Sequence, residues 1–122
     1  VWCVKDRQPV FDNEEWKKAL ADVLTSIAHE KEFLIEMIDI KDDYVHLLIS
    51  CKPQHYIPDI IKTLKGGSGR KMQCLLPDLQ KRMADQYHIW DTSYMIVSGA
   101  ADASEDVEAY ISNYKMYRTY RK

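Results

Sequence analysis

Two apolar segments separated by a short polar turn constrain the fold of this chain more than any other feature. Residues 33–40 alternate in the manner of a strand, and residues 44–51 give the clearest strand pattern of all. Lys41, Asp42 and Asp43 between them are typical turn residues. Residues 1–5 begin with Val-Trp-Cys-Val, which is β-branched and aromatic, and predict a further strand.

A helix is predicted from about residue 12 to Lys31, because apolar residues recur there at helical spacing. Asp12 is the predicted N-cap, and Glu15 stands three residues later, as in a capping box. Phe11 is placed to pack onto Trp16 as a hydrophobic staple. These signals together predict that the helix begins directly after Asp12.

A second helix is predicted to open at Pro58. The cluster Gly66-Gly67-Ser68-Gly69 is expected to interrupt or bend it, and a further helical stretch follows from about residue 70 to 84, broken near Pro77. Residues 93–98 predict a fourth strand, and Ser104-Glu105-Asp106 opens a final helix.

The resulting order is strand, helix, strand, strand, helix, strand, helix. This is the ferredoxin-like βαββαβ pattern, an α+β sandwich with an antiparallel four-stranded sheet, followed by one extra C-terminal helix. A chain of 122 residues suits one domain over 1–122. Because Val1 reads as the middle of a strand, we expect a short N-terminal piece to precede it.

Composition excludes several classes of protein. With 46% hydrophobic and 30% charged residues, the chain is neither disordered nor collagen-like. Cys3, Cys51 and Cys74 are isolated and odd in number, which argues against a disulfide framework and a zinc ribbon and suits a reducing compartment. No apolar run approaches membrane-spanning length and no signal peptide is recognisable, so we expect a cytoplasmic protein without a membrane partner.

The basic residues are concentrated in one stretch of the sequence. The net charge of −2 excludes a globally basic protein, but six cations lie between residues 62 and 82, opposed there only by Asp78: Lys62, Lys65, Arg70, Lys71, Lys81 and Arg82. The stretch is interpreted either as a basic face for nucleic acid or as an ordinary solvated surface. The neighbouring glycines could let backbone N–H groups approach a phosphate, although they match neither a P-loop nor a dinucleotide fingerprint.

Two pairs of side chains could carry chemistry. Tyr44 and His46 share one face of their strand, because side chains two residues apart point the same way, while Val45, Leu47 and Ile49 point oppositely. The pair is either a site or a half-buried polar surface. Tyr110 and Tyr114 lie one helical turn apart, and a tyrosine can act as a covalent nucleophile, but the same stripe could simply pack on the sheet.

Five segments together resemble the small single-tyrosine, HUH-type transposases of insertion sequences, the IS200-like transposase family, which act on single-stranded DNA. The segments are residues 1–11, the strand 43–50, the helix 57–70 with Lys-Gly-Gly-Ser-Gly-Arg, the stretch 89–94 with Ile-Trp-Asp-Thr-Ser-Tyr, and Tyr110-Ile111. The resemblance covers almost the whole chain.

The resemblance implies a homodimer with a ferredoxin-like fold that binds single-stranded or hairpin DNA. It implies that two histidines and a glutamine hold Mg²⁺ or Mn²⁺, and that a tyrosine attacks the scissile phosphate to leave a 5′-phosphotyrosine. By position, the nucleophile is Tyr110 and the retained metal ligand is His46. The expected DNA-binding residues are Lys62, Lys65, Arg70 and Lys71.

Two of the three metal-ligating positions depart from the family. Tyr44 stands where the family has its first histidine, and Tyr114 where it has glutamine. A neutral phenol is a poor ligand for a hard cation, and one imidazole does not hold Mg²⁺. Three hypotheses stay open: a transposase that cleaves DNA through Tyr110, an inactive DNA-binding descendant, and an interaction module without nucleic acid. Asp43, His55, His88 and Asn113 offer no clear replacement ligand.

Overall fold

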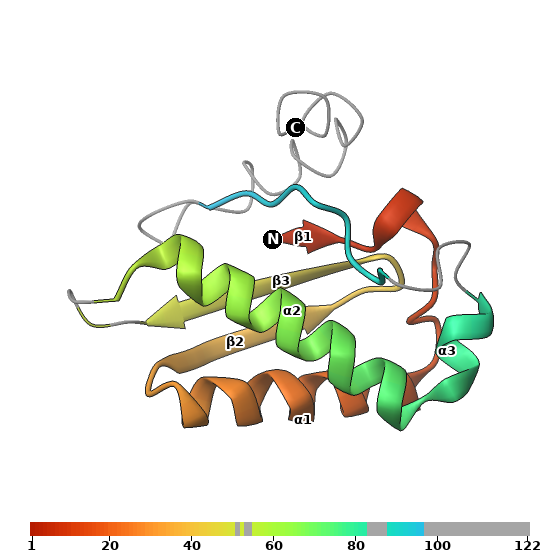
Figure 1. Cartoon of the computed structure of the whole chain (residues 1–122), viewed down its shortest axis with the longest axis horizontal. Coiled ribbons are helices and arrows are strands. Elements are labelled where there is room, and N and C mark those ends of the chain that lie inside the picture. Colours follow the sequence, from red (N-terminus) through yellow and green to blue (C-terminus); the bar gives the residue numbers. More distant parts are fainter. Residues whose placement is uncertain (51, 53–54, 83–87, 97–122) are drawn as a thin grey trace.

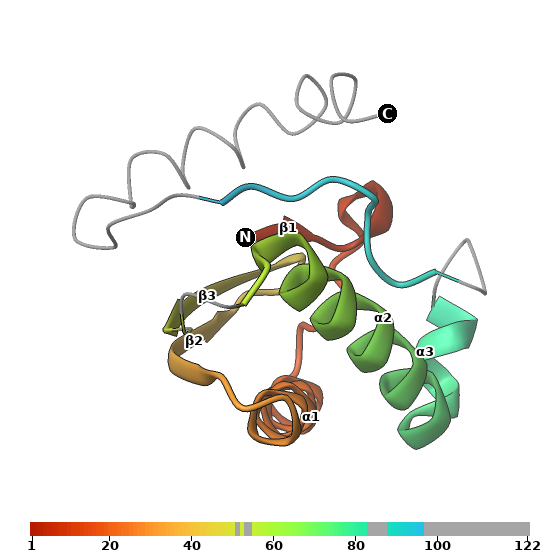
Figure 2. The same ribbon diagram turned by 60° about the vertical axis from the view of Figure 1, so that its left-hand side comes forward.

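The computed structural model describes residues 1–50, 52, 55–82 and 88–96 of the chain. Its sheet holds three antiparallel strands in the order β1-β3-β2, with β1 at Trp2–Cys3, β2 at Leu34–Ile40 and β3 at Tyr44–Ser50. Helices α1 (Glu14–Glu30) and α2 (Ile57–Leu75) cover one face of this sheet, and the short α3 (Pro77–Arg82) follows α2 (Figures 1 and 2). The mixed α+β architecture predicted from the sequence is confirmed at this level.

Strand β1 is shorter than the sequence predicted. Residues 5–7 form a 3-10 helix instead of continuing the strand, and Asp6 and Arg7 both adopt positive φ angles, 56° and 53°. This left-handed turn carries the chain away from the sheet. The Arg7 guanidinium then reaches back to the Asp43 carboxylate, with 2.8 Å between Nη2 and Oδ2, and ties the turn to the start of β3.

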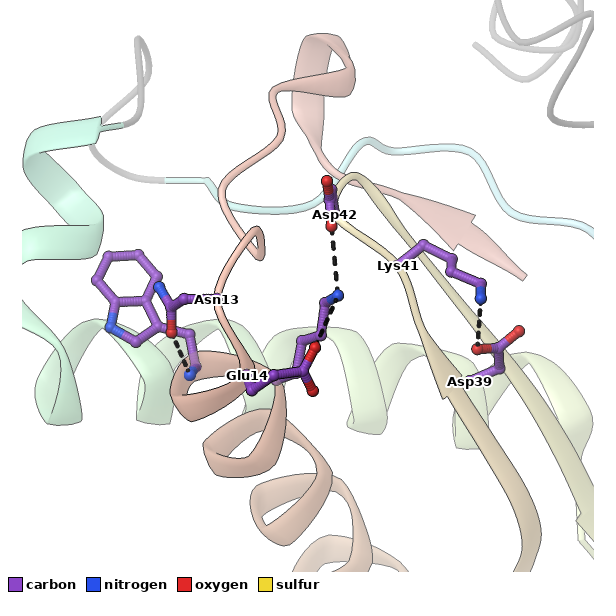
Figure 3. Close-up of polar contacts among 7 residues, drawn as sticks. Asn13, Glu14, Asp39, Lys41 and Asp42 are labelled. Carbon is purple, nitrogen blue, oxygen red and sulfur yellow. Dashed lines mark hydrogen bonds and ion pairs between the residues drawn. The ribbon is translucent and has the colours of Figure 1, made fainter.

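Helix α1 begins one residue later than predicted from an N-cap at Asp12. Asn13, not Asp12, is the N-cap, and its side-chain oxygen accepts a hydrogen bond from the Trp16 backbone N–H at 2.7 Å (Figure 3). Lys17 then contacts both Glu14, at 3.6 Å, and Asp42 in the β2–β3 turn, at 3.3 Å. The cap therefore stabilises the start of α1, and the ion pair between Lys17 and Asp42 attaches it to the β2–β3 turn.

Helix α2 runs without a break through the glycine cluster, so the predicted interruption was wrong. An added Cβ at Gly67 would lie 3.0 Å from Ile27 Cδ1, so the missing side chain lets α1 and α2 approach closely. Ser68 is fully buried, and its Oγ accepts a hydrogen bond from Trp90 Nε1 at 3.0 Å. Tertiary packing thus offsets the low helix propensity of glycine, about 1 kcal/mol per residue.

The core lies between the sheet and the two long helices. On β3 it takes Val45, Leu47 and Ile49, as the alternation predicted. Trp90 joins this core from the end of the described chain, where its ring stacks on Phe11 with 5.7 Å between centroids. None of the helices in the described part of the chain combines the length and the hydropathy that a membrane span requires.

The segment 89–96 runs beside β1 but is not a strand over residues 93–96, contrary to the prediction for 93–98 (Figure 2). It is antiparallel to β1, with a bridge between Val4 and Trp90 and a hydrogen bond from the Met95 backbone N–H to the Val1 carbonyl. Between these points Lys65 Nζ donates to the carbonyls of Asp91 and Ser93. The carbonyl oxygens of Asp91 and Ser93 are therefore bonded to a side chain of α2, whereas in a regular strand they would accept hydrogen bonds from a neighbouring strand. Residues 97–98 and the predicted final helix lie outside the described residues.

Candidate functional site

Tyr44 and His46 lie on the face of the sheet opposite α1 and α2, which we call the outer face. Tyr44 packs against the buried Cys3, as Val1 and Met95 also do, in a small cluster separate from the main core. Its neighbour Val45 is fully buried in that core. The predicted division of β3 into two faces is therefore confirmed, and the outer face carries the polar pair.

His46 faces a carboxylate across the sheet. The register pairs it with Asp39 on β2, whose Oδ1 lies 3.4 Å from Lys41 Nζ (Figure 3). Burial lowers the pKa of His46 from its usual 6.5, although the charge of Asp39 partly opposes this. At neutral pH the imidazole is consequently uncharged and keeps a lone pair for hydrogen bonding or ligation.

Tyr44 and Cys3 remain protonated at neutral pH. Burial is the main cause that raises the pKa of the Tyr44 phenol above 10. Burial also raises the pKa of the Cys3 thiol to about 11. Neither side chain therefore offers an anionic oxygen or sulfur, and the phenol is present as a hydrogen-bond donor next to His46.

The described part of the outer face does not fit the Mg²⁺ or Mn²⁺ that the sequence resemblance implies. No group of three or more His, Cys, Asp or Glu side chains among the described residues could hold a metal ion. Asp43 is ion-paired with Arg7, and His55 Nδ1 accepts from the Lys52 backbone N–H at the far end of β3. Among these side chains, His46 and Asp39 are then the two left to bind a metal ion, whereas Mg²⁺ demands near-octahedral oxygen coordination. Tyr110 and Tyr114 lie outside the described residues.

The four predicted DNA-binding cations of α2 divide into two kinds. Lys62, Arg70 and Lys71 are exposed. Lys65 is half-buried, and its ammonium donates to the carbonyls of Asp91, at 2.5 Å, and Ser93, at 3.2 Å. The position of Lys65 depends on a segment 26 residues further along the chain, so no local pattern could have revealed it.

The glycines beside these cations do not form a phosphate-binding loop. They lie inside α2, where backbone N–H groups bond to the carbonyl four residues earlier. The prediction that these N–H groups approach a phosphate was therefore wrong. Sequence reasoning also missed a groove between α1 and α2, of about 820 Å³, whose lining includes Val23, Leu75, Asp22, Gly67, Arg70 and Lys71.

The structure places the chain in the class of antiparallel α+β domains, with a polar pair on the outer face of the sheet and exposed cations on α2. Comparison with known proteins identifies the family. The family model described as "Transposase IS200 like" matches residues 1–114. The chain is 34% identical over 113 residues to the ISDra2 transposase TnpA of Deinococcus radiodurans, covering 93% of this chain and 79% of that protein. The chain belongs to the IS200-like transposase family.

A solved structure agrees with this assignment. The chain resembles the crystal structure of a protein from Deinococcus radiodurans R1 assigned as a transposase, with a TM-score of 0.84 and 33% sequence identity. The match covers 92% of this chain and 85% of that one. The family resemblance recognised in the sequence motifs is confirmed.

Proposed function

We propose that this chain binds single-stranded or hairpin DNA through α2, and that it does so without a divalent cation. The observation that carries the proposal is the set of exposed cations Lys62, Arg70 and Lys71 on one helix of a transposase-family fold. Within the described residues these three cations take part in no salt bridge, unlike Lys17, which is held by Asp42. Free cations of this kind bind phosphates and release counterions.

The metal-free part of the proposal follows from the donor chemistry of the outer face. Tyr44 occupies the position of a metal-ligating histidine, and its phenol is protonated at neutral pH. Tyr114 replaces a second ligand in the sequence. Metal polarisation is worth several kcal/mol of transition-state stabilisation, so its loss lowers a cleavage rate by roughly 10³-fold or more. Cleavage through Tyr110 is thus the alternative, not the main proposal.

Two finer features are part of the same proposal. The segment 89–96 takes the place of the fourth strand of a ferredoxin-like sheet beside β1, without regular strand structure over residues 93–96; the bridge from Val4 to Trp90 supports this. The chain acts as a homodimer, as the resemblance to the family implies. Both would be tested by an experimental structure of the DNA-bound chain.

The first test measures DNA affinity by fluorescence anisotropy with a labelled hairpin oligonucleotide in EDTA. Between 50 and 200 mM salt, the logarithm of the affinity should fall linearly with the logarithm of salt concentration, with about 0.7 to 0.9 units of slope per phosphate contact. Lys62→Gln and Lys71→Gln should each reduce the slope, whereas Lys18→Gln on the exposed side of α1 should not. A flat salt dependence, or no binding, would favour an interaction module without nucleic acid.

The second test addresses cleavage. The chain is incubated with single-stranded DNA and Mn²⁺, and covalent adducts are sought on a denaturing gel with Tyr110→Phe as the control. We expect no adduct from the natural chain. An adduct that disappears in the Tyr110→Phe variant would overturn the metal-free proposal. Tyr44→His combined with Tyr114→Gln should gain Mn²⁺ binding by calorimetry if only the ligands have changed.

A further inference from the structure

Gly66 is a glycine that the packing of the described chain does not require. It lies in the interior of α2, it is exposed, and an added Cβ would meet no atom within 4 Å. Its neighbours differ, because a Cβ at Gly67 would come within 3.0 Å of Ile27, and one at Gly69 would lie 3.7 Å from Trp90. Glycine in an exposed helix interior costs about 1 kcal/mol relative to alanine, without any gain here from closer packing.

Gly66 stands between two exposed cations. Lys62, Gly66 and Arg70 are spaced four residues apart and therefore form one row along α2. At 1.5 Å of rise per residue, the two cations are about 12 Å apart along the helix axis. At Gly66, midway between them, no side chain covers the helix backbone. Asp59, one turn before Lys62, is the acidic residue nearest the row along the helix, and it lies at the end away from Arg70.

We propose that a DNA strand lies along this row, with phosphates on Lys62 and Arg70 and the sugar–phosphate backbone in direct contact with α2 at Gly66. The inference rests on the proposed DNA binding and names the contact. A side chain at residue 66 would hold the strand away from the helix and lengthen the contacts of both cations. A second copy of this chain is a poorer occupant, because a two-fold contact through the row would bring like charges together.

The test separates helix stability from DNA affinity. Gly66→Ala should raise the melting temperature, since alanine favours the helix and its methyl group has open space. The same variant should bind the hairpin oligonucleotide more weakly, and Gly66→Gln about tenfold more weakly, because its longer side chain holds the phosphates away from Lys62 and Arg70. Gly69→Ala is the matched control, because its methyl group would face Trp90, and it should bind DNA as the natural chain does.

The salt dependence distinguishes the glycine from its neighbours. Lys62→Gln and Arg70→Gln should each lower the slope of the salt dependence for the hairpin oligonucleotide by about 0.7 to 0.9. Gly66→Ala should weaken binding at every salt concentration with less change of slope. If the natural chain does not bind DNA, the proposed function fails. If it binds and Gly66→Ala binds equally well, only this inference fails. A Gly66→Ala variant that is less stable, or that changes oligomeric state, would likewise overturn it.

Discussion

Removal of the Ser68 hydroxyl is the sharpest test of why α2 continues through its glycines. Ser68 Oγ accepts a hydrogen bond from Trp90 Nε1 at 3.0 Å, and Ser68 is fully buried while Trp90 is 7% exposed. Ser68→Ala leaves the indole N–H without its acceptor in a site that excludes water. A buried donor without a partner costs about 1–3 kcal/mol.

The net magnitude includes a gain. Alanine is a better helix former than serine by about 0.5 kcal/mol, so we expect Ser68→Ala to lower the free energy of unfolding by about 0.5–2.5 kcal/mol. For a domain of this size the melting temperature should fall by about 2–10 °C. The measurement is thermal unfolding followed by circular dichroism and tryptophan fluorescence.

Ser26→Ala is the matched control, because Ser26 is exposed in the interior of α1 and gains the same helix propensity. Its melting temperature should rise slightly. A double-mutant cycle with Trp90→Phe should then show that Ser68→Ala costs less once the indole N–H is gone. Equal effects of Ser68→Ala and Ser26→Ala would refute the claim that the Ser68–Trp90 hydrogen bond holds α2 together.

Three further predictions follow from the same structure. Gly67→Ala should raise the melting temperature less than Gly66→Ala does, because its Cβ would lie 3.0 Å from Ile27 Cδ1 and this crowding offsets part of the gain in helix propensity; an equal rise would mean that the two helices separate freely. Asn13→Ala should cost about 1 kcal/mol of unfolding free energy through the lost cap, measured by urea denaturation. Alkylation followed by peptide mass spectrometry at pH 8 should modify the exposed Cys74 and spare the buried Cys3, whose pKa is raised to about 11; rapid modification of Cys3 would contradict this.

The pH dependence of stability gives a related expectation for Cys3. Because burial raises the pKa of its thiol to about 11, the unfolded chain loses this proton at a lower pH than the folded chain does. The unfolded state therefore binds fewer protons between about pH 9 and 11, and stability should fall across that range. Cys3→Ala should remove this part of the fall in urea denaturation measured at pH 8 and pH 10.

The sequence predicted the elements whose signals are local. Alternation along β3 placed Tyr44 and His46 on one face and Val45 on the other, because a strand has a strict period of two. The cap of α1 was misplaced by one residue, since Asp12 and Asn13 are chemically equivalent as capping residues and only the chain path selects Asn13.

The errors concern features set by distant contacts. The glycine cluster reads as a helix break, but Ser68 and Trp90, 22 residues apart, stabilise a continuous helix. Lys65 reads as one more surface cation, but the carbonyls of residues 91 and 93 bind its ammonium. The groove between α1 and α2 has no linear signature at all, because its lining comes from two helices brought together by packing.

Helix α2 is proposed to bind DNA without the metal of the family. The most direct measurement is the affinity of the full chain for a labelled hairpin oligonucleotide in EDTA, repeated after addition of Mn²⁺. We predict binding in EDTA that weakens steeply with salt and that Mn²⁺ leaves unchanged. Binding that develops only with Mn²⁺, and that His46→Ala abolishes, would show that the outer face holds a metal after all and would contradict the account.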